Sequence, residues 1–268
     1  MAVRTRENAP AFRHLVAARE LLWSFVQRDL IVRYRTPVMG VGWALATPLA
    51  QMAIFSLVFT RVARVDVGGG LPYPLYAYVG LTAWTLTAAA LREATTSLTA
   101  NPVLLTKVRF PREVLPLAPV CTALTDFFVA ELLVVGLMWF YGVALQWTVV
   151  FFPVVLVVHL TLIVGLALLF AVANLFWRDV RHLFDIVITV WMFASSVVYP
   201  VQQIGGRTGA LLALNPMTHI IEAYRDVLLH GRMPAAAPFL LVSLASAMVL
   251  AAGWLVFKRT SRRFAELA

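Results

Sequence analysis

Long apolar segments separated by short polar connections dominate the chain, and their spacing predicts its architecture. A helix needs about 20 predominantly apolar residues to cross a bilayer. Segments of about that length occur six times, at residues 38–62, 74–98, 114–143, 148–177, 183–199 and 236–257. The pattern therefore predicts an all-α polytopic membrane protein. Six transmembrane helices form a membrane domain at 38–257, between a tail at 1–37 and a basic tail at 258–268.

The segment before the first predicted span has an amphipathic pattern. A stripe at helical spacing contains Phe12, Leu15, Val16, Trp23, Val26 and Leu30, whereas Leu21, Phe25 and Ile31 lie off it. Such a stripe suits a helix that lies in the membrane interface. We predict an interfacial helix within 1–37, with a loosely ordered tail as the alternative. No cleavage site follows the basic start, so we expect the first span to act as the insertion signal.

Basic residues are distributed unevenly among the predicted loops. The chain has 22 Lys and Arg against 13 Asp and Glu, for a net charge of +9. If the N-terminus is inside, 16 basic residues lie on the inner side and five, Arg61, Arg64, Arg207, Arg225 and Arg232, on the outer side. Positive charge collects in cytoplasmic loops. The bias therefore predicts cytoplasmic termini and explains the charge without a nucleic-acid partner.

A short helix is predicted between the fifth and sixth spans, at 216–230. Asn215 suits an N-cap, Pro216 the first helical position and Gly231 the stop. About 15 residues give roughly 22 Å, which is too short to span. One face carries Met217, Ile220, Ile221, Tyr224, Val227 and Leu228, and the other His219, Glu222, Arg225 and Asp226. We expect an outer helix that dips into the outer leaflet or lines an exit. The alternative is an interfacial anchor without a role in transport.

Two inner connections carry further information. Residues 101–112 form a basic segment bracketed by Pro102 and Pro111, with apolar residues between them. Such a segment suits docking to a soluble partner, and the alternative is an ordinary positive-inside loop. The connection at 177–182 is so short that the fourth and fifth spans must form a hairpin.

Four ionisable residues lie within predicted spans: Arg92, Glu93, Asp126 and Glu131. Charges inside a membrane are expensive and usually paired or functional. We predict structural pairing between helices, such as Arg92 with Asp126, in preference to a proton relay. The lone His159 within the fourth span is expected to be a packing or hydrogen-bonding residue.

The composition excludes several classes of protein. Hydrophobic residues make up 61% of the chain and charged residues 13%, far from a soluble enzyme. No G-x-x-x-x-G-K-[ST] loop is present, so ATP cannot be held by that route. No H-E-x-x-H or CxxC pattern suggests a metal, and the single Cys121 suits a small buried residue better than a nucleophile. We therefore expect no catalytic residue in this chain and no cofactor of its own.

Four stretches of the chain, which begin at Arg28, Phe110, Asn174 and Asn215, together resemble one family, the membrane subunits of bacterial polysaccharide ABC exporters. The family has an arginine-rich entry followed by glycine, tryptophan and proline, as in Arg28–Arg35, Gly40, Gly42, Trp43 and Pro48 here. Further matches are 110–116, Asn174 with Phe176 and 178–180, and Asn215-Pro216 with 221–226. One departure is Ser196, where the family commonly has proline, so the bend of the fifth span is expected to differ.

The resemblance implies a partnership and a cargo. It implies a homodimer of this chain with two copies of a cytoplasmic ATP-binding subunit, which holds the ATP and Mg. Its cargo would be a lipid-linked polysaccharide of the O-antigen, teichoic acid or galactan type, crossing the bacterial cytoplasmic (inner) membrane. Contact with the ATP-binding subunit is implied for Arg28, Asp29, Arg33, Arg35, Lys107, Arg109, Phe110 and Arg112.

The resemblance also implies a channel at the dimer interface and an outer gate. Because the first and fifth spans would line the channel, the expected path residues are Trp43, Phe55, Phe59, Trp191, Phe193 and Tyr199. The helix at 216–230 would form part of the gate, with Asn215, Pro216, Glu222, Tyr224 and Arg225 as its expected residues.

Two other functions stay open from sequence. An ABC exporter of a drug or small lipid would differ only in cargo. A membrane-embedded transferase on a lipid phosphate would need clustered acidic or histidine residues, and the inner side offers mainly Asp29, Glu113, Asp179 and Asp185, each close to an arginine.

Overall fold

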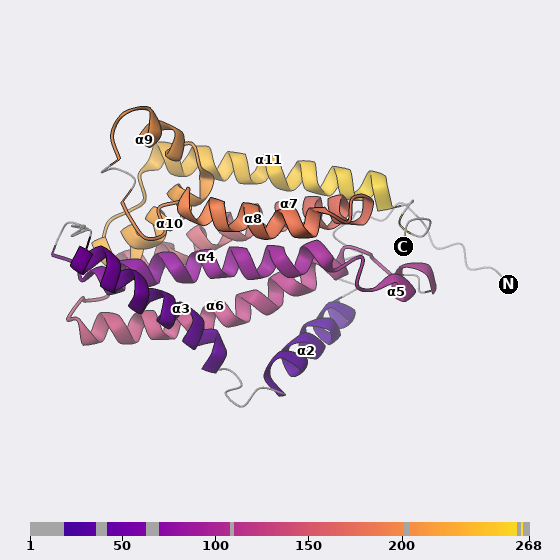
Figure 1. Cartoon of the computed structure of the whole chain (residues 1–268), viewed down its shortest axis with the longest axis horizontal. Helices are drawn as coiled ribbons and strands as arrows, with labels where there is room; N and C mark the ends of the chain where they lie inside the picture. The colour runs from indigo at the N-terminus through magenta and orange to yellow at the C-terminus, as the bar shows by residue number, and fades with distance from the viewer. Residues whose placement is uncertain are drawn as a thin grey trace.

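The computed structural model describes residues 19–35, 42–62, 70–107, 110–200, 204–261 and 264, and this part of the chain is helical without strands (Figure 1). The helices run roughly along one axis, and the short helices α9 and α10 gather at one end. Helix α5 and the C-terminal end of α11 lie toward the opposite end, which is called the inner end here after the predicted orientation. The elements are α2 (Arg19–Arg35), α3 (Gly42–Ser56) with a π-helical turn (Leu57–Val62), α4 (Tyr73–Thr96), α5 (Pro102–Lys107), α6 (Val114–Phe140), a 3-10 turn (Trp147–Phe151), α7 (Phe152–Phe176), α8 (Val180–Phe193), α9 (Gly206–Leu212), α10 (Pro216–Arg225) with a π-helical turn (Asp226–His230), and α11 (Ala236–Thr260).

Three helices of the described chain are long and apolar enough to cross a membrane: Val114–Phe140, Trp147–Phe176 and Ala236–Thr260. They correspond to the third, fourth and sixth predicted spans. The predicted second span is the 24-residue α4, which is buried over most of its length. The predicted first and fifth spans contain shorter α-helices, α3 with 15 residues and α8 with 14. The count of six spans and the side of the termini stay predictions.

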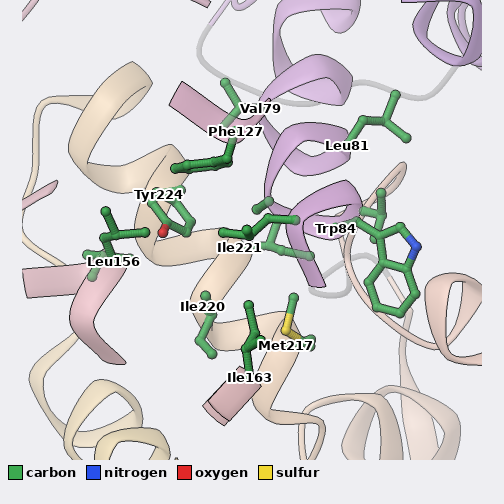
Figure 2. Packing of buried hydrophobic residues seen from close by; sticks show 14 of the residues in the cluster. Val79, Leu81, Trp84, Phe127, Leu156, Ile163, Met217, Ile220, Ile221 and Tyr224 are labelled. Atoms are coloured by element: carbon green, nitrogen blue, oxygen red, sulfur yellow. The ribbon is translucent and has the colours of Figure 1, made fainter. Parts of the chain in front are cut away.

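Helix α4 is the centre of the bundle. It packs against α3, α6, α7, α8 and α10, and its side chains from Leu75 to Ala94 contribute to the main core. Helix α10 inserts its apolar residues into that core, as Figure 2 shows. The labelled neighbours come from α4 (Val79, Leu81, Trp84), α6 (Phe127), α7 (Leu156, Ile163) and α10 itself (Met217, Ile220, Ile221, Tyr224).

Helices α7 and α11 approach each other through two glycines. A Cβ built at Gly253 would lie 2.4 Å from the carbonyl oxygen of Gly165, and one at Gly165 would lie 2.6 Å from the backbone nitrogen of Leu250. Small residues at such crossings let helices in a membrane pack backbone to backbone. The opposite face of α11 exposes Leu240, Leu241, Leu244 and Met248, which suits contact with lipid.

A second core lies at the inner end and joins α2 to the inner connections. Phe25 and Val26 of α2 pack there with Leu105 of α5 and Phe257 of α11. The predicted helix before the first span is therefore present over Arg19–Arg35, and Val26 and Leu30 of its predicted stripe pack on this core. Phe12, Leu15 and Val16 of the stripe lie outside the described residues. Trp23 is 59% exposed whereas Phe25 is buried, because α2 lies across α6 and uses Phe25 for that contact.

The bounds and caps predicted for the short helix are confirmed. Helix α10 and its π-helical turn cover 216–230, the Asn215 side chain accepts a hydrogen bond from the backbone nitrogen of Met217, and Gly231 ends the helix at a φ of 63°. The polar face of this helix is partly or fully covered by the rest of the chain. Arg225 is fully buried and Asp226 nearly so, because α4 and the turn after α8 cover that face.

Candidate functional site

The guanidinium of Arg225 is the centre of a buried polar network, here called the outer network. Its Nη1 donates to the hydroxyl of Tyr76 at 2.8 Å, the carbonyl of Ser196 at 2.6 Å and a carboxylate oxygen of Glu222 at 2.8 Å. Its Nη2 donates to the carbonyl of Val197 at 2.7 Å. A buried charge is tolerated only when paired and hydrogen-bonded. The outer network therefore fastens α10 to α4 and to the turn that follows α8.

Ser196 contributes to the outer network through both backbone and side chain. Its hydroxyl donates to Glu222 at 2.7 Å. Helix α8 already ends at Phe193, so the chain leaves the helix here without a proline at residue 196. The serine thus takes the place of the helix breaker common in the family and supplies a hydrogen bond in addition.

The start of α10 is tied to the end of α8 through Asn215. Its amide oxygen accepts from the Trp191 indole nitrogen at 3.0 Å and from the Met217 backbone nitrogen at 3.0 Å. Its amide nitrogen donates to the carbonyl of Ala194 and the hydroxyl of Ser195, each at 2.8 Å. One side chain therefore caps α10 and holds the turn after α8. The sequence predicted only the capping role.

Two of the predicted path residues form an aromatic row at the outer end of α3. The ring centroids of Phe55 and Phe59 are 6.1 Å apart, and Phe59 stacks on Tyr73 at 5.8 Å. The Tyr73 hydroxyl donates to the carbonyl of Val198 at 2.7 Å. The row thus connects α3 to the segment after α8. The side chain of the predicted Trp43 lies outside the described residues.

The path residues of the fifth span lie elsewhere. Trp191 packs edge-on against Trp84 of α4 at 5.5 Å, Phe193 is 51% exposed, and the hydroxyl of Tyr199 donates to the carbonyl of Phe193. Within one chain, the described path residues therefore do not form one lining. Sequence reasoning missed the contribution of α4. The close spacing of Tyr73, Tyr76 and Gly80, which all take part, was the available signal.

A second cluster of charges, here called the inner cluster, joins α2 to two predicted spans. Arg33 pairs with Glu93 of α4 and with Asp126 of α6, and the hydroxyl of Tyr34 donates to Asp126. Burial alone would lower the pKa of Arg33, but Glu93 and Asp126 together raise it. The inner cluster therefore stabilises α2 against the bundle with a permanently charged arginine.

The predicted pairing of Arg92 with Asp126 is wrong. Arg92 donates from Nε to Asp185 of α8 at 2.9 Å, and Asp126 is held by Arg33. Neighbouring residues on a helix point about 100° apart, so Arg92 and Glu93 reach different partners. The general expectation of structural pairing between helices is confirmed, with α2 supplying the arginine that the sequence reasoning did not consider.

Two further titratable side chains inside the bundle have hydrogen-bond partners, whereas the buried hydroxyls of Tyr78 and Ser246 have none within the described part of the chain. Glu131 accepts from the Thr82 hydroxyl at 2.9 Å. His159 lies between Thr87 and Tyr224, at 2.7 Å and 3.3 Å, which confirms its expected hydrogen-bonding role. No group of three or more His, Cys, Asp or Glu side chains suited to a metal ion occurs among the residues that the structure describes.

The predicted contact residues for a partner subunit are only partly described. Arg28 and Asp29 form an ion pair at 2.9 Å on α2. The side chains of Arg35 and Lys107, and the whole of Arg109, lie outside the described residues. Arg28 is about half exposed, so it is available at the inner end.

Arg112 makes its contacts within the chain. It donates to the backbone carbonyls of Ser261 and Leu105 and lies 5.8 Å from the ring of Phe264. Phe110 is half-buried against the same inner core. Arg112 thus fastens the inner segment to the end of α11, and its contact with a partner stays a prediction.

The comparisons with known proteins agree with this arrangement. A sequence profile of the ABC-2 type transporter matches residues 20–229. The O-antigen export system permease protein RfbA of Myxococcus xanthus is 34% identical over 256 residues, which are 95% of this chain and 97% of that protein. Two proteins of the same name from Klebsiella pneumoniae are 25% and 26% identical over 250 residues, each covering 92% of this chain and 95% of the relative. The matched region contains the inner cluster, the outer network and the helices between them, and the chain belongs to the ABC-2 type transporter family.

Proposed function

We propose that this chain is the transmembrane subunit of an ATP-driven exporter that moves a lipid-linked polysaccharide of the O-antigen type across the bacterial cytoplasmic membrane. The observation that carries the proposal is the similarity over nearly the whole chain to proteins named O-antigen export permeases. The ATP would be hydrolysed by a separate subunit, since this sequence has no phosphate-binding G-x-x-x-x-G-K-[ST] loop.

The position of α4 supports a coupling role between the two ends. Its inner end carries Glu93 of the inner cluster, and its outer end carries Tyr76 of the outer network. The two residues are separated by 17 helical positions, or about 26 Å. A partner that displaces α2 would therefore act, through Arg33 and one rigid helix, on the packing of α10.

Two copies of the chain would enclose the path. Helix α8 exposes a continuous apolar face with Leu183, Ile186, Val187, Val190 and Phe193. A face of this kind suits either lipid or a second copy. In the proposed assembly, α3 and α8 of each copy face one another across the path, and α10 lies beside its outer end.

The proposal is tested by purification and reconstitution. Tagged chain is purified in mild detergent from the membranes in which it is normally made, and co-purifying proteins are identified by mass spectrometry. The complex is then placed in vesicles with a radiolabelled polyprenyl-linked polysaccharide. We expect an ATP-binding subunit in equal amount and movement of label that needs ATP and stops with ADP.

Three outcomes distinguish the alternatives. Movement of a small lipid or drug without movement of the glycan would mean that the exporter carries the smaller molecule and not a polysaccharide. Movement by this chain alone, without an ATP-binding subunit, would contradict the proposed mechanism. Turnover of a lipid phosphate by the chain alone, abolished in Asp29→Ala and Asp179→Ala, would favour a transferase.

A further inference from the structure

A polar pocket lies between the inner ends of α4 and α8. Neither Arg225 of the outer network nor Arg33 of the inner cluster lines it. Its volume is about 380 Å³, and its walls include Arg92, Thr96 and Thr99 from α4 and its end, with Arg181 and Asp185 from α8. Ligand pockets typically have volumes of about 300–1,000 Å³. The pocket, here called the inner pocket, is therefore large enough for one compact polar group.

Two arginines supply donors to the inner pocket. Arg92 uses its Nε for Asp185, which leaves its terminal amino groups for a ligand. Arg181 is exposed and forms no ion pair with any residue in the described part of the chain. Planar guanidinium groups bind phosphate oxygens with paired hydrogen bonds. One side of the inner pocket therefore suits a phosphate.

The other polar groups of the inner pocket are acceptors. Thr96 already donates its hydroxyl proton to the carbonyl of Glu93 at 3.2 Å, and Thr99 donates to the carbonyl of Thr96 at 3.0 Å. The hydroxyl oxygens can therefore only accept from a ligand. The carboxylates of Glu93 and Asp185 also line the pocket; each is paired with an arginine, Arg33 or Arg92, and has further lone pairs that can accept. A ligand that satisfies these groups must carry hydroxyl protons.

The charges of the inner pocket favour a mixed ligand over a simple anion. Arg92 is paired with Asp185, and Glu93 is paired with Arg33. Arg181 is therefore the one lining charge without an ion-pair partner in the described chain, and an inorganic phosphate would gain the attraction of little more than a single charge. A sugar phosphate uses both sides, because its phosphate accepts from the arginines and its hydroxyls donate to the acceptors.

We propose that the inner pocket binds the glycosyl phosphate group that joins the sugar chain to its lipid carrier. Arg92 and Arg181 bind the phosphate, and Thr96 and Asp185 accept from hydroxyls of the first sugar. The inference rests on the proposed function, because it assumes a lipid-linked glycan as cargo. Helix α4 ends and α8 begins at the pocket, on the predicted cytoplasmic side. The pocket therefore lies where such a substrate would enter.

The phosphate half is tested by binding to the full chain in lipid nanodiscs. The probes are polyprenyl phosphate glucose, polyprenyl phosphate and glucose 1-phosphate. The variant Arg181→Gln is compared with Arg178→Gln, a matched control because Arg178 is also exposed on this connection but does not line the pocket. We expect Arg181→Gln to weaken binding of both lipid probes about tenfold and Arg178→Gln to leave it unchanged. Glucose 1-phosphate carries the sugar phosphate without the polyprenyl chain. We expect it to bind more weakly than the lipid probes, but its binding should still be weakened by Arg181→Gln.

The sugar half is tested with Thr96→Val, which keeps the shape and removes the acceptor oxygen. We expect binding of polyprenyl phosphate glucose to weaken about threefold, with polyprenyl phosphate unaffected. Thr106→Val, at an exposed position of α5 outside the pocket, is the control and should change neither. Equal effects of Thr96→Val on both lipid probes would overturn the sugar assignment.

The failure of this inference differs from failure of the proposed function. If the wild-type chain binds polyprenyl phosphate glucose and transports the glycan, but Arg181→Gln binds equally well, only the assignment of the inner pocket is overturned. If the wild-type chain binds no lipid probe and moves no glycan, the proposed cargo is overturned together with the pocket.

Discussion

Gly80 of α4 lies directly against the guanidinium of Arg225. A Cβ built at residue 80 would lie 2.5 Å from Nη2 of Arg225 and 2.4 Å from the carbonyl oxygen of Val197. The arginine cannot retreat, because its hydrogen bonds fix it against Tyr76 and Ser196. The outer network therefore requires a residue without a side chain at this point of a central helix.

The first prediction follows from this contact. Gly80→Ala should destabilise the chain by about 1–3 kcal/mol, because an added methyl group must displace either the arginine or a backbone carbonyl. The measurement is the thermal unfolding midpoint of the purified protein in detergent. Gly136→Ala is the matched control, since a Cβ at Gly136 of α6 meets nothing within 4 Å, and alanine is the better helix former. If both variants unfold at the wild-type temperature, the tight contact at Gly80 is absent.

A second prediction concerns the buried charge itself. Arg225→Gln should destabilise the chain by about 3–5 kcal/mol, because it leaves Glu222 without its arginine and removes donors from three backbone carbonyls. Arg28→Gln is the control: Arg28 pairs with Asp29 at 2.9 Å, and both side chains are partly exposed, so the loss should stay below about 1 kcal/mol. Unfolding monitored by tryptophan fluorescence checks both. Similar small effects would mean that Arg225 contributes no more than a surface pair.

The same region shows what the sequence could and could not predict. The bounds of α10 depend on local signals, the Asn215 cap, Pro216 and Gly231, and the prediction was correct to the residue. The burial of Arg225 depends on Tyr76, about 150 positions earlier, and on a turn after α8. No periodicity within α10 reports such partners, so the pattern identified the polar stripe but not its burial.

The ionisable residues of the predicted spans show the same contrast between what the local sequence predicts and what depends on distant packing. Their positions gave a correct expectation of pairing, because an unpaired charge in a membrane is costly. The partners depended on the packing of α2 against α6, which brings Arg33 to Asp126. Candidate path residues were chosen by family resemblance, and the fold within one chain cannot by itself bring α3 and α8 aromatics together.

A third prediction tests the inner cluster. Glu93→Gln and Asp126→Asn each remove one partner of Arg33, and Arg33→Gln removes both. The pairs are partly exposed, so each carboxylate substitution should lower stability by less than about 1 kcal/mol. The Arg33 variant should have the larger effect because two carboxylates are left close together. In double-mutant cycles, each carboxylate should show a coupling energy to Arg33 of about 0.5 kcal/mol or more.

The control for the inner cluster is Arg28→Gln. Arg28 is also on α2, but it pairs with its neighbour Asp29 and is about half exposed. It should show no coupling to Glu93 or Asp126. Coupling energies near zero for Arg33 itself would contradict the role of the inner cluster in holding α2 to α4 and α6.

The fourth prediction decides the orientation of the chain, on which the entry and exit sides depend. The single native cysteine is first removed as Cys121→Ser, which leaves a background without thiols. Met233→Cys then places one thiol at an exposed position just after α10, and Arg259→Cys places one near the end of α11. The uneven distribution of basic residues predicts that residue 233 is outside and residue 259 is in the cytoplasm.

An impermeant maleimide applied to intact spheroplasts should therefore label Met233→Cys at once and Arg259→Cys only after the membrane is permeabilised. Because α11 is one continuous apolar helix of 25 residues between the two positions, the two thiols should never be labelled from the same side. Labelling in the reverse order would invert the chain, and it would move the inner pocket and α2 away from any cytoplasmic ATP-binding subunit. Labelling of both thiols in intact spheroplasts would mean that α11 does not cross the membrane. That outcome would leave a 25-residue apolar helix with its exposed leucine face in water, which is energetically unfavourable.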